Sequence, residues 1–311
     1  MSPNVAVAAH PQPGLLGRLQ REIRASNKWA YLFILPLLLD FLIFTAYTVL
    51  RVGLLSFQEL SYGQTTWVGL QHFRWILYDP QFWNAMKNTA IYTLITVPGG
   101  NVVALVLSEL IYRRSQALQT FFKSAYYLPS VVSTAVLAIV WSWIYQPFHG
   151  ILNYFISLFG LEPINWLGNP KTAMPAIIAM SIVVGVGVSV VFITAAMGGI
   201  PTELYDAAKI DGASEWVRFW RVTVPLLRPT LLYLFVVGFI GNFQVFEQIY
   251  IMTQGGPGYP GATETVGFLI YAAAFRSFNI GLAATESVML FFAIIIFSVA
   301  QFRLFASELE Y

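Results

Sequence analysis

Six stretches of apolar residues, each long enough to cross a lipid bilayer as a helix, are the feature that most limits how this chain folds. A spanning helix needs about 20 predominantly apolar residues, and the stretches cover residues 29–50, 85–111, 121–145, 174–197, 226–252 and 281–305. Soluble domains carry about 25% charged residues, whereas this chain of 311 residues has 10%. We therefore expect an all-α, polytopic membrane protein with six transmembrane helices.

The distribution of Lys and Arg predicts the orientation of these helices, because cytoplasmic segments carry an excess of both residues. Twelve of the 17 fall on one side of the membrane if the N-terminus is cytoplasmic. We expect residues 1–28 to form a cytoplasmic tail, residues 29–305 the transmembrane domain, and residues 306–311 a cytoplasmic C-terminus. The tail lacks an apolar core followed by a small-residue cleavage site, so we do not interpret it as a cleaved signal peptide.

Several function classes are disfavoured by what the sequence lacks. The absence of cysteine excludes disulfides and thiolate sites, and the three histidines are too scattered for a metal centre. A net charge of +2 gives no case for nucleic acid. Gly185 and Gly187 lie inside an apolar stretch, so they are no nucleotide fingerprint and instead favour close helix packing. The sequence also has no phosphate-binding loop, so we expect a partner to supply the energy. We predict no catalytic residue, cofactor or metal in this chain.

Residues 198–225, the polar connection between the fourth and fifth stretches, predict two short helices separated by a turn. Thr202 is expected to cap a helix that ends at Ile210. Asp211 and Gly212 would break this helix, because glycine tolerates the left-handed conformation that ends many helices. Ser214 would cap the second helix.

The surface expected on this connection suits contact with another protein. Trp216 and Trp220 are four residues apart, so they share a helix face. Ala207, Ala208 and Ala213 are small enough to let another surface approach closely.

This connection resembles the EAA loop of binding-protein-dependent ABC importers. The resemblance rests on Asp206-Ala207-Ala208, on Gly212 four positions later, and on the following Val224-Pro225. Asp206 replaces the usual glutamate, which shortens the carboxylate by one methylene. The resemblance implies a type I importer permease fold, in which this coupling loop (residues 198–225) sits in a groove of the ATP-binding subunit. The coupling residues would be Glu203, Asp206, Ala207, Ala208, Asp211 and Gly212.

Further motifs are similar to those of carbohydrate-uptake permeases of the maltose and glycerol-phosphate type. These motifs are Asp79-Pro80, Asn88-Thr89, Leu128-Pro129, Gly255-Gly256-Pro257 and Thr263-Glu264-Thr265. The chain resembles a six-span version of the larger subunit of the maltose permease. This implies a transport subunit rather than an enzyme, located in the bacterial inner membrane and carrying a di- or oligosaccharide. The implied partners are a homologous second permease, two copies of an ATP-binding subunit and an external solute-binding protein.

Polar residues within the apolar stretches predict where the solute binds, because such residues are costly in a membrane and usually functional. Amide side chains supply both donors and acceptors for sugar hydroxyls. By resemblance, Gly185 and Asn242 fall on sugar-contacting positions of the family, whereas Val188 and Val245 replace two other contacts. Gln244 and Gln248 are expected on one helix face, with Glu247 beside them. The predicted substrate-binding set is Gly185, Ser189, Asn242, Gln244, Glu247 and Gln248.

Other interpretations stay open from the residues alone. The polar side chains of the fifth stretch would also suit hydrogen bonds between helices, and Glu109 is expected to pair with Arg113 or Arg114. A secondary transporter would need repeats or ion-binding carboxylates. A membrane-embedded glycosyltransferase would need paired carboxylates at a membrane face, and no Asp-x-Asp pair occurs. Glycerol phosphate remains compatible as a solute, although the stretches offer no buried Lys or Arg, which favours a neutral sugar.

Overall fold

The computed structural model describes residues 31–61, 64–256 and 261–306. The predicted N-terminal tail (1–28) and residues 307–311 of the predicted C-terminal tail lie outside these ranges. The chain divides into two units between Leu54 and Leu55.

The first unit is a single membrane-length helix. It runs from Tyr31 to Leu55, over 25 residues, and contains an 18-residue window with a mean hydropathy of 2.1. Within it, the π-helical turn η1 (Phe41–Ala46) precedes α2 (Tyr47–Leu55). Asp40, one of the few charged residues in the apolar stretches, lies directly before η1. The first predicted span is therefore confirmed, and it ends five residues later than expected.

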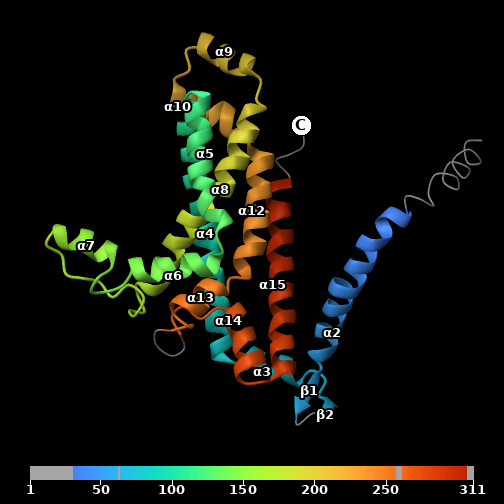
Figure 1. Ribbon diagram of the computed structural model, residues 1–311. Coiled ribbons are helices and arrows are strands. Elements are labelled where there is room, and N and C mark those ends of the chain that lie inside the picture. The colour runs from blue at the N-terminus through green and yellow to red at the C-terminus, as the bar shows by residue number, and fades with distance from the viewer. Residues whose placement is uncertain (1–30, 62–63, 257–260, 307–311) are drawn as a thin grey trace, which may run out of the picture. The chain divides into compact units, whose positions relative to one another are not determined.

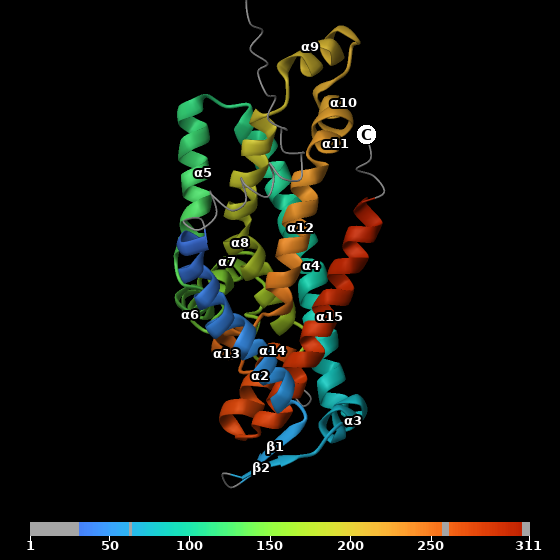
Figure 2. The same cartoon turned by 90° about the vertical axis from the view of Figure 1, so that its right-hand side faces the viewer.

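The second unit is a helical bundle with a small hairpin at one end (Figures 1 and 2). Its elements, in chain order, are β1 (Gln58–Ser61), β2 (Gln64–Trp67), α3 (Gln71–Tyr78), α4 (Pro80–Tyr112), α5 (Gln116–Val131), α6 (Thr134–Ile144), α7 (Ile151–Leu158), α8 (Ala173–Gly198), α9 (Thr202–Ile210), α10 (Glu215–Arg218), η2 (Phe219–Thr223), α11 (Val224–Leu226), α12 (Arg228–Phe243), α13 (Glu247–Met252), α14 (Val266–Tyr271), η3 (Ala272–Arg276) and α15 (Ile280–Ala306).

The number of spans agrees with the six predicted stretches. In the described part of the chain, four helices are long and apolar enough to cross a membrane alone, and six if each of two bent pairs counts as one span. The bent pairs are α5 with α6, at 98°, and the segment Glu215–Leu226 with α12, at 65°. Proline lies near both bends, Pro129 in the last turn of α5 and Pro225 with Pro229 around the second. Proline removes a backbone donor and crowds the preceding turn, which favours a break there.

The fifth span is shorter than predicted, and this corrects one expectation. α12 ends at Phe243, and a new short helix, α13, begins at Glu247. Gln244 and Gln248 are four apart in sequence but lie on opposite sides of this break. The prediction that they share the face of one continuous helix is therefore wrong.

Three connections between spans contain regular structure that was not predicted, among them the one that holds α7. β1 and β2 pair antiparallel, with Gln58 opposite Trp67 and Ser61 opposite Gln64, so the fold is predominantly rather than entirely helical. The connection at residues 253–279 is helical from Val266 to Arg276. This segment is an apolar run too short to span a bilayer, which explains why it was not recognised as a helix.

α8 lies at the centre of the bundle, packed between α4 and α5, while α12 contacts both α4 and α15 (Figure 2). Gly187 allows α5 to approach α8 closely: a Cβ atom there would lie 1.9 Å from the carbonyl oxygen of Tyr126 on α5. A Cβ atom at Gly185 would meet nothing within 4 Å. Close helix packing was predicted for both glycines, and it is confirmed for Gly187 only.

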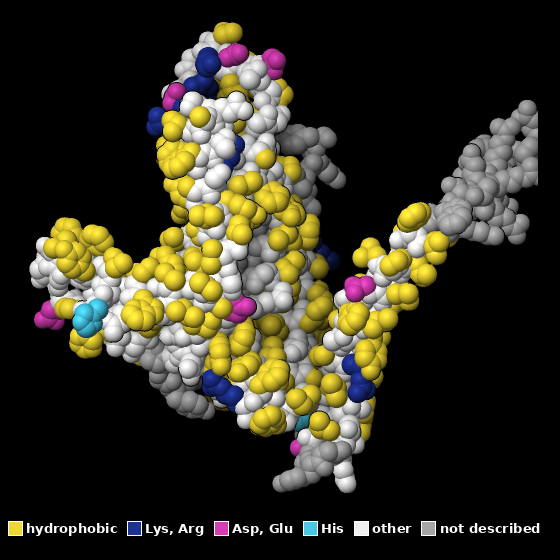
Figure 3. Space-filling view, in the orientation of Figure 1, with side chains coloured by type: hydrophobic (Ala, Val, Ile, Leu, Met, Phe, Trp, Pro, Cys, Tyr) yellow, Lys and Arg dark blue, Asp and Glu magenta, His cyan; other side chains and the backbone are white. Residues whose placement is uncertain are grey.

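Side chains on the bundle surface are distributed as a membrane requires. Hydrophobic side chains cover much of the helical bundle, and charged side chains gather at the end that carries α9 and α10 (Figure 3). The described C-terminal end of α15 lies at this same end of the second unit (Figure 1).

Candidate functional site

The coupling loop projects from one end of the bundle as a short exposed helix. α9 covers Thr202–Ile210, and Gly212 follows with φ +76°, so the predicted left-handed break is confirmed. The hydroxyl of Ser214 accepts a hydrogen bond from the Val217 amide and caps α10, also as predicted. The prediction for Thr202 is wrong, because the helix begins at this residue and its side chain caps nothing.

Most of the predicted coupling residues are accessible on this loop. Glu203, Asp206, Ala207, Asp211 and Gly212 are exposed, and Ala208 is half-buried. Ile210 is 87% exposed and Trp216 is 70% exposed. The rings of Trp216 and Trp220 lie 5.6 Å apart, so they share a face as expected. The role of the six predicted coupling residues stays a prediction.

The loop is held firmly at its base. Phe219 is buried in a cluster with Met197 and Leu227. The hydroxyl groups of Tyr205 and Thr223 lie 3.0 Å apart, and burial raises the pKa of Tyr205. These contacts leave α9 exposed while they fix the point at which the loop joins the bundle.

An ionic contact joins the loop to α4. Arg113 hydrogen-bonds to Glu109 on its own helix, which confirms the predicted pairing, and to Glu215 on α10. Burial lowers the pKa of Arg113, but its contacts with Glu109 and Glu215 outweigh this effect and raise the pKa above its usual value. Arg218 lies 3.6 Å from Glu215. The sequence did not indicate that Glu215 takes part.

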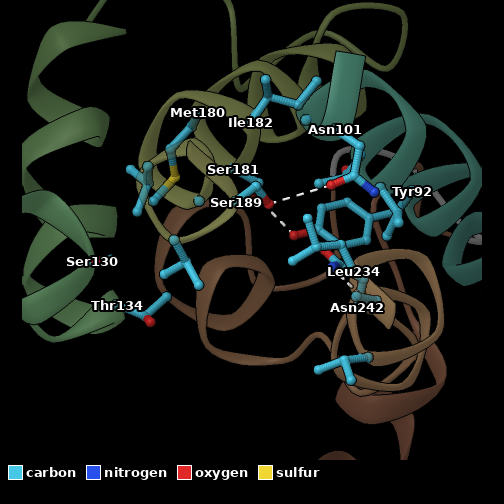
Figure 4. Close-up of a pocket in the computed structure, with 18 of the residues that line it drawn as sticks. Tyr92, Asn101, Ser130, Thr134, Met180, Ser181, Ile182, Ser189, Leu234 and Asn242 are labelled. Atoms are coloured by element: carbon cyan, nitrogen blue, oxygen red, sulfur yellow. Dashed lines mark hydrogen bonds between the residues drawn. The ribbon is translucent and has the colours of Figure 1, made fainter. Parts of the chain in front are cut away.

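A cavity of about 390 Å³ lies between α4, α8 and α12 in the membrane-spanning part of the bundle. We call this the central cavity (Figure 4). A second cavity of about 480 Å³ adjoins it and shares Tyr92, Thr134, Asn242 and Gln248 with it. Both volumes fall within the range of about 300–1,000 Å³ that is usual for small-molecule sites.

The two cavities bring together all six predicted substrate-binding residues. Gly185 and Ser189 line the central cavity, and Gln244 and Glu247 line the adjoining one. Asn242 and Gln248 border both cavities. Their role in binding a solute stays a prediction.

Two of the predicted amides use part of their hydrogen-bonding capacity on their own helix. The side-chain nitrogen of Asn242 donates to the carbonyl oxygen of Gly238 at 2.8 Å, and that of Gln244 donates to Ile240 at 2.8 Å. Their carbonyl oxygens remain the groups best suited to accept from a solute.

The central cavity also contains polar residues that the sequence analysis missed. Tyr92 and Asn101 on α4, with Ser181 on α8, line its wall. Tyr92 donates to Ser181 at 2.9 Å, and Ser189 donates to the side-chain oxygen of Asn101 at 3.3 Å. The signal available in the sequence was an asparagine in the middle of the second apolar stretch.

Other polar residues within or beside the apolar stretches are structural. Glu264 accepts a hydrogen bond from the side chain of Gln81 at 2.8 Å, and its backbone oxygen accepts from Asn88. The hydroxyl of Thr89 accepts from the backbone nitrogen of Val266. These contacts tie the connection before α14 to α4, which explains the motif residues in both segments. Glu286 is buried on α15 and lines neither cavity.

The chain is similar in sequence to known membrane proteins. Residues 97–307 match the family described as binding-protein-dependent transport system inner membrane component. An arabinooligosaccharides transport system permease protein of Bacillus subtilis (strain 168) is 31% identical over 311 residues, which cover 99% of this chain and 98% of the relative. A trehalose/maltose transport system permease protein of Thermococcus litoralis is 29% identical, covering 89% of this chain and 93% of the relative.

A solved structure has a similar fold. It is a bacterial ABC transporter involved in the import of the acidic polysaccharide alginate. One of its chains superposes with a TM-score of 0.83 at 23% identity, covering 94% of this chain and all of that chain.

Proposed function

Because the chain belongs to the family of binding-protein-dependent transport system inner membrane components, we propose that it is the permease subunit of an ABC importer for a di- or oligosaccharide. The type I permease fold predicted from the sequence is confirmed by the structural likeness. The chain is a multi-pass inner membrane protein. In our proposal both termini are cytoplasmic, and the chain carries no catalytic residue and no cofactor of its own.

The observation that carries this proposal is the exposed coupling loop. α9 presents Asp206 and Ile210 to solvent, and the left-handed Gly212 turns the chain back toward the bundle. The adjacent rings of Trp216 and Trp220 add contiguous exposed apolar surface to this loop, and such contiguous surface marks protein-binding sites. The partner proposed is an ATP-binding subunit, of which the complete importer holds two copies.

The remaining partners follow from the same family. The permease would pair with a homologous second permease and receive its solute from an external solute-binding protein. The relatives that transport arabinooligosaccharides and trehalose or maltose support a carbohydrate as the solute.

The contacts of the loop indicate how movement would pass from the ATPase to the solute. The base of the loop is joined to α4 through Arg113 and continues into α12 through η2 and α11. α4 and α12 also carry two walls of the central cavity. Closure of the ATP-binding subunits would therefore move both the loop and the cavity walls, and it would expose the solute site to each side of the membrane in turn.

Reconstitution tests the proposal against its alternatives. The chain is co-expressed with its candidate second permease and ATP-binding subunits, purified as a complex and placed in liposomes with the binding protein outside. We expect uptake of a labelled disaccharide that requires ATP inside the liposomes. Uptake by the purified chain alone, driven by an ion gradient, would identify a secondary transporter. Turnover of a lipid-linked sugar without ATPase partners would identify a glycosyltransferase.

A further inference from the structure

Asn101 is a buried amide on the wall of the central cavity with an unused hydrogen-bond donor. The residue is 6% exposed, and its side-chain nitrogen has no hydrogen-bond partner among the residues that the structure describes. Its side-chain oxygen is occupied by the hydroxyl of Ser189. A buried donor without a partner is unfavourable, so a ligand that offers an acceptor at this position would be bound there.

Tyr92 lies on the same helix and offers the complementary group. Its hydroxyl donates to Ser181, and Ser181 in turn donates to the backbone oxygen of Ile177 at 2.9 Å. With its proton committed, the oxygen of Tyr92 is an acceptor. Tyr92 and Asn101 are nine residues apart, which places them about 13 Å apart along a helix that rises 1.5 Å per residue.

The rest of the wall restricts the charge of the ligand. None of the described residues that line the central cavity is Asp, Glu, Lys, Arg or His. Val97, Val188 and Phe192 supply apolar surface between the polar groups. An anion taken into this cavity would lose its hydration without gaining a counter-charge, which is strongly unfavourable. A hydroxyl group both donates and accepts, so it suits a wall with a donor at one end and an acceptor at the other.

We propose that Asn101 and Tyr92 on α4, held by Ser189 and Ser181 on α8, form a wall that binds the hydroxyl groups of an uncharged saccharide and disfavours anionic solutes. This inference rests on the proposed function and narrows its substrate class. It adds α4 to the fourth and fifth spans as a source of solute contacts (Figure 4). It also removes glycerol phosphate from the compatible solutes.

Thiol labelling tests whether the wall faces a solute. This chain has no cysteine, so Asn101→Cys gives it a single reactive group, and modification is read on this subunit after it is separated from the complete transporter. Ser108→Cys is the matched control, because Ser108 also lies on α4, is fully buried and contacts α8 through Val190, but does not line the cavity. We expect a small methanethiosulfonate reagent to modify position 101 and not position 108. A panel of neutral disaccharides (maltose, trehalose and lactose) should slow this modification, whereas a disaccharide of uronic acids should not.

Two labelling results would overturn the inference. One is the absence of modification at position 101. The other is modification that none of the three neutral disaccharides slows, or that only the uronic acid disaccharide slows.

Uptake measurements test the two side chains separately. In liposomes that hold the complete transporter, Asn101→Ala and Tyr92→Phe should each lower uptake of the transported neutral saccharide by about twofold to tenfold, the effect of one neutral hydrogen bond. Hydrolysis of ATP stimulated by the binding protein should persist. Tyr145→Phe is the control, because the hydroxyl of Tyr145 makes a similar 2.9 Å bond to Ala176 on α8 but lies outside the central cavity.

The outcomes separate this inference from the proposed function. Uptake at the unaltered rate in both Asn101→Ala and Tyr92→Phe would overturn the inference and leave the proposed function intact. Parallel loss of uptake and of stimulated ATP hydrolysis would indicate a structural role and overturn it too. If the unaltered transporter showed no ATP-dependent uptake of any saccharide, the proposed function would fail and the inference with it.

Discussion

The guanidinium of Arg113, directly after the last turn of α4, donates a hydrogen bond to the carboxylate of Glu215 at the start of α10. The two residues are far apart in sequence, and their contact joins a helix that lines the central cavity to the loop proposed to bind the ATPase. Their side chains are 37% and 69% exposed. Ion pairs this exposed stabilise a protein by about 0–1 kcal/mol, so the contact matters more for where the loop is held than for whether the chain folds.

Charge reversal at Arg113 should therefore uncouple transport and leave the fold intact. In Arg113→Glu the new carboxylate would face Glu109 and Glu215, and the repulsion would displace α10 from the end of α4. We expect uptake to fall at least tenfold while the melting temperature of the complex changes little. The measurement is the ratio of saccharide imported to ATP hydrolysed in liposomes.

The matched control and the rescue make this prediction specific. Arg114→Glu makes the same change of charge at the next residue and should keep normal coupling. Adding Glu215→Arg to Arg113→Glu should restore part of the uptake. No recovery in the double variant, together with a defect in Arg114→Glu, would show that net charge at this surface is responsible.

Gly212 should be required for the shape of the coupling loop. Its φ of +76° is a conformation that residues with a Cβ atom rarely adopt, although a Cβ there would meet nothing within 4 Å. Backbone strain alone should destabilise the turn after α9 in Gly212→Ala by about 1–2 kcal/mol. We expect weaker co-purification of the ATP-binding subunit.

Gly198→Ala is the control for this change. Gly198 also lies in the coupling loop and has open space around it, but its φ is not positive. This variant should retain the ATP-binding subunit. Equal retention by both variants would argue against a left-handed turn as the basis of docking.

Gly185 and Gly187 should respond differently to the same substitution. A Cβ at Gly187 would collide with the carbonyl oxygen of Tyr126, so α5 and α8 would have to separate. Overpacking of this kind costs about 1–3 kcal/mol. Gly187→Ala should lower the melting temperature of the purified complex. Gly185 lines the central cavity, so Gly185→Ala should leave the melting temperature unchanged and lower uptake. A matching loss of stability in both variants would contradict this assignment.

The sequence predicted the parts of the fold that depend on composition and periodicity. Six apolar stretches indicated the spans, and Gly212 with Ser214 indicated the turn of the coupling loop. The breaks at Phe243 and after Val131 were missed, because an apolar run looks the same whether or not its helix bends. Pro129 marked one of these breaks, but prolines also occur within intact helices, as Pro98 does in α4.

The candidate site was predicted in part for a similar reason. Gly185 and Asn242 were found because their positions match the motifs of a known family. Gln244, Glu247 and Gln248 were found because they are polar residues in an apolar stretch. Tyr92 and Asn101 lie on the second stretch, and only the packing of α4 against α8 places them beside Ser181 and Ser189. A contact between helices depends on their rotation and crossing, which periodicity along one chain does not determine.

Glu264 should make stability depend on pH. It is 6% exposed, and burial raises the pKa of its carboxyl, only partly opposed by the hydrogen bond from Gln81. A carboxyl with a raised pKa binds its proton more tightly in the folded protein than in the unfolded chain. Its contribution to stability is therefore greatest below the unfolded pKa and is lost as pH rises through the folded pKa.

The variant Glu264→Gln isolates this contribution, since the amide keeps an oxygen that Gln81 can reach and carries no charge. We expect the variant to melt at the same or a higher temperature than the unaltered protein at pH 7. The difference should shrink as the pH falls toward 4. A variant that is less stable at pH 7, and equally so at pH 4, would show that the ionised carboxylate is needed at this position.

Asn242 should affect uptake more than its neighbour Gln244, although both side chains make the same kind of bond. Each donates at 2.8 Å to the carbonyl oxygen four residues earlier. Loss of either bond should therefore change stability by a similar small amount, about 1 kcal/mol or less.

Asn242 borders both cavities, whereas Gln244 borders only the adjoining one. We expect Asn242→Ala to reduce uptake about tenfold with the complex still assembled, and Gln244→Ala to reduce it less. Initial rates of saccharide uptake, measured with equal amounts of assembled complex, give the comparison. Unchanged uptake in Asn242→Ala would remove this residue from the solute path, because the structural part of its role is matched by Gln244.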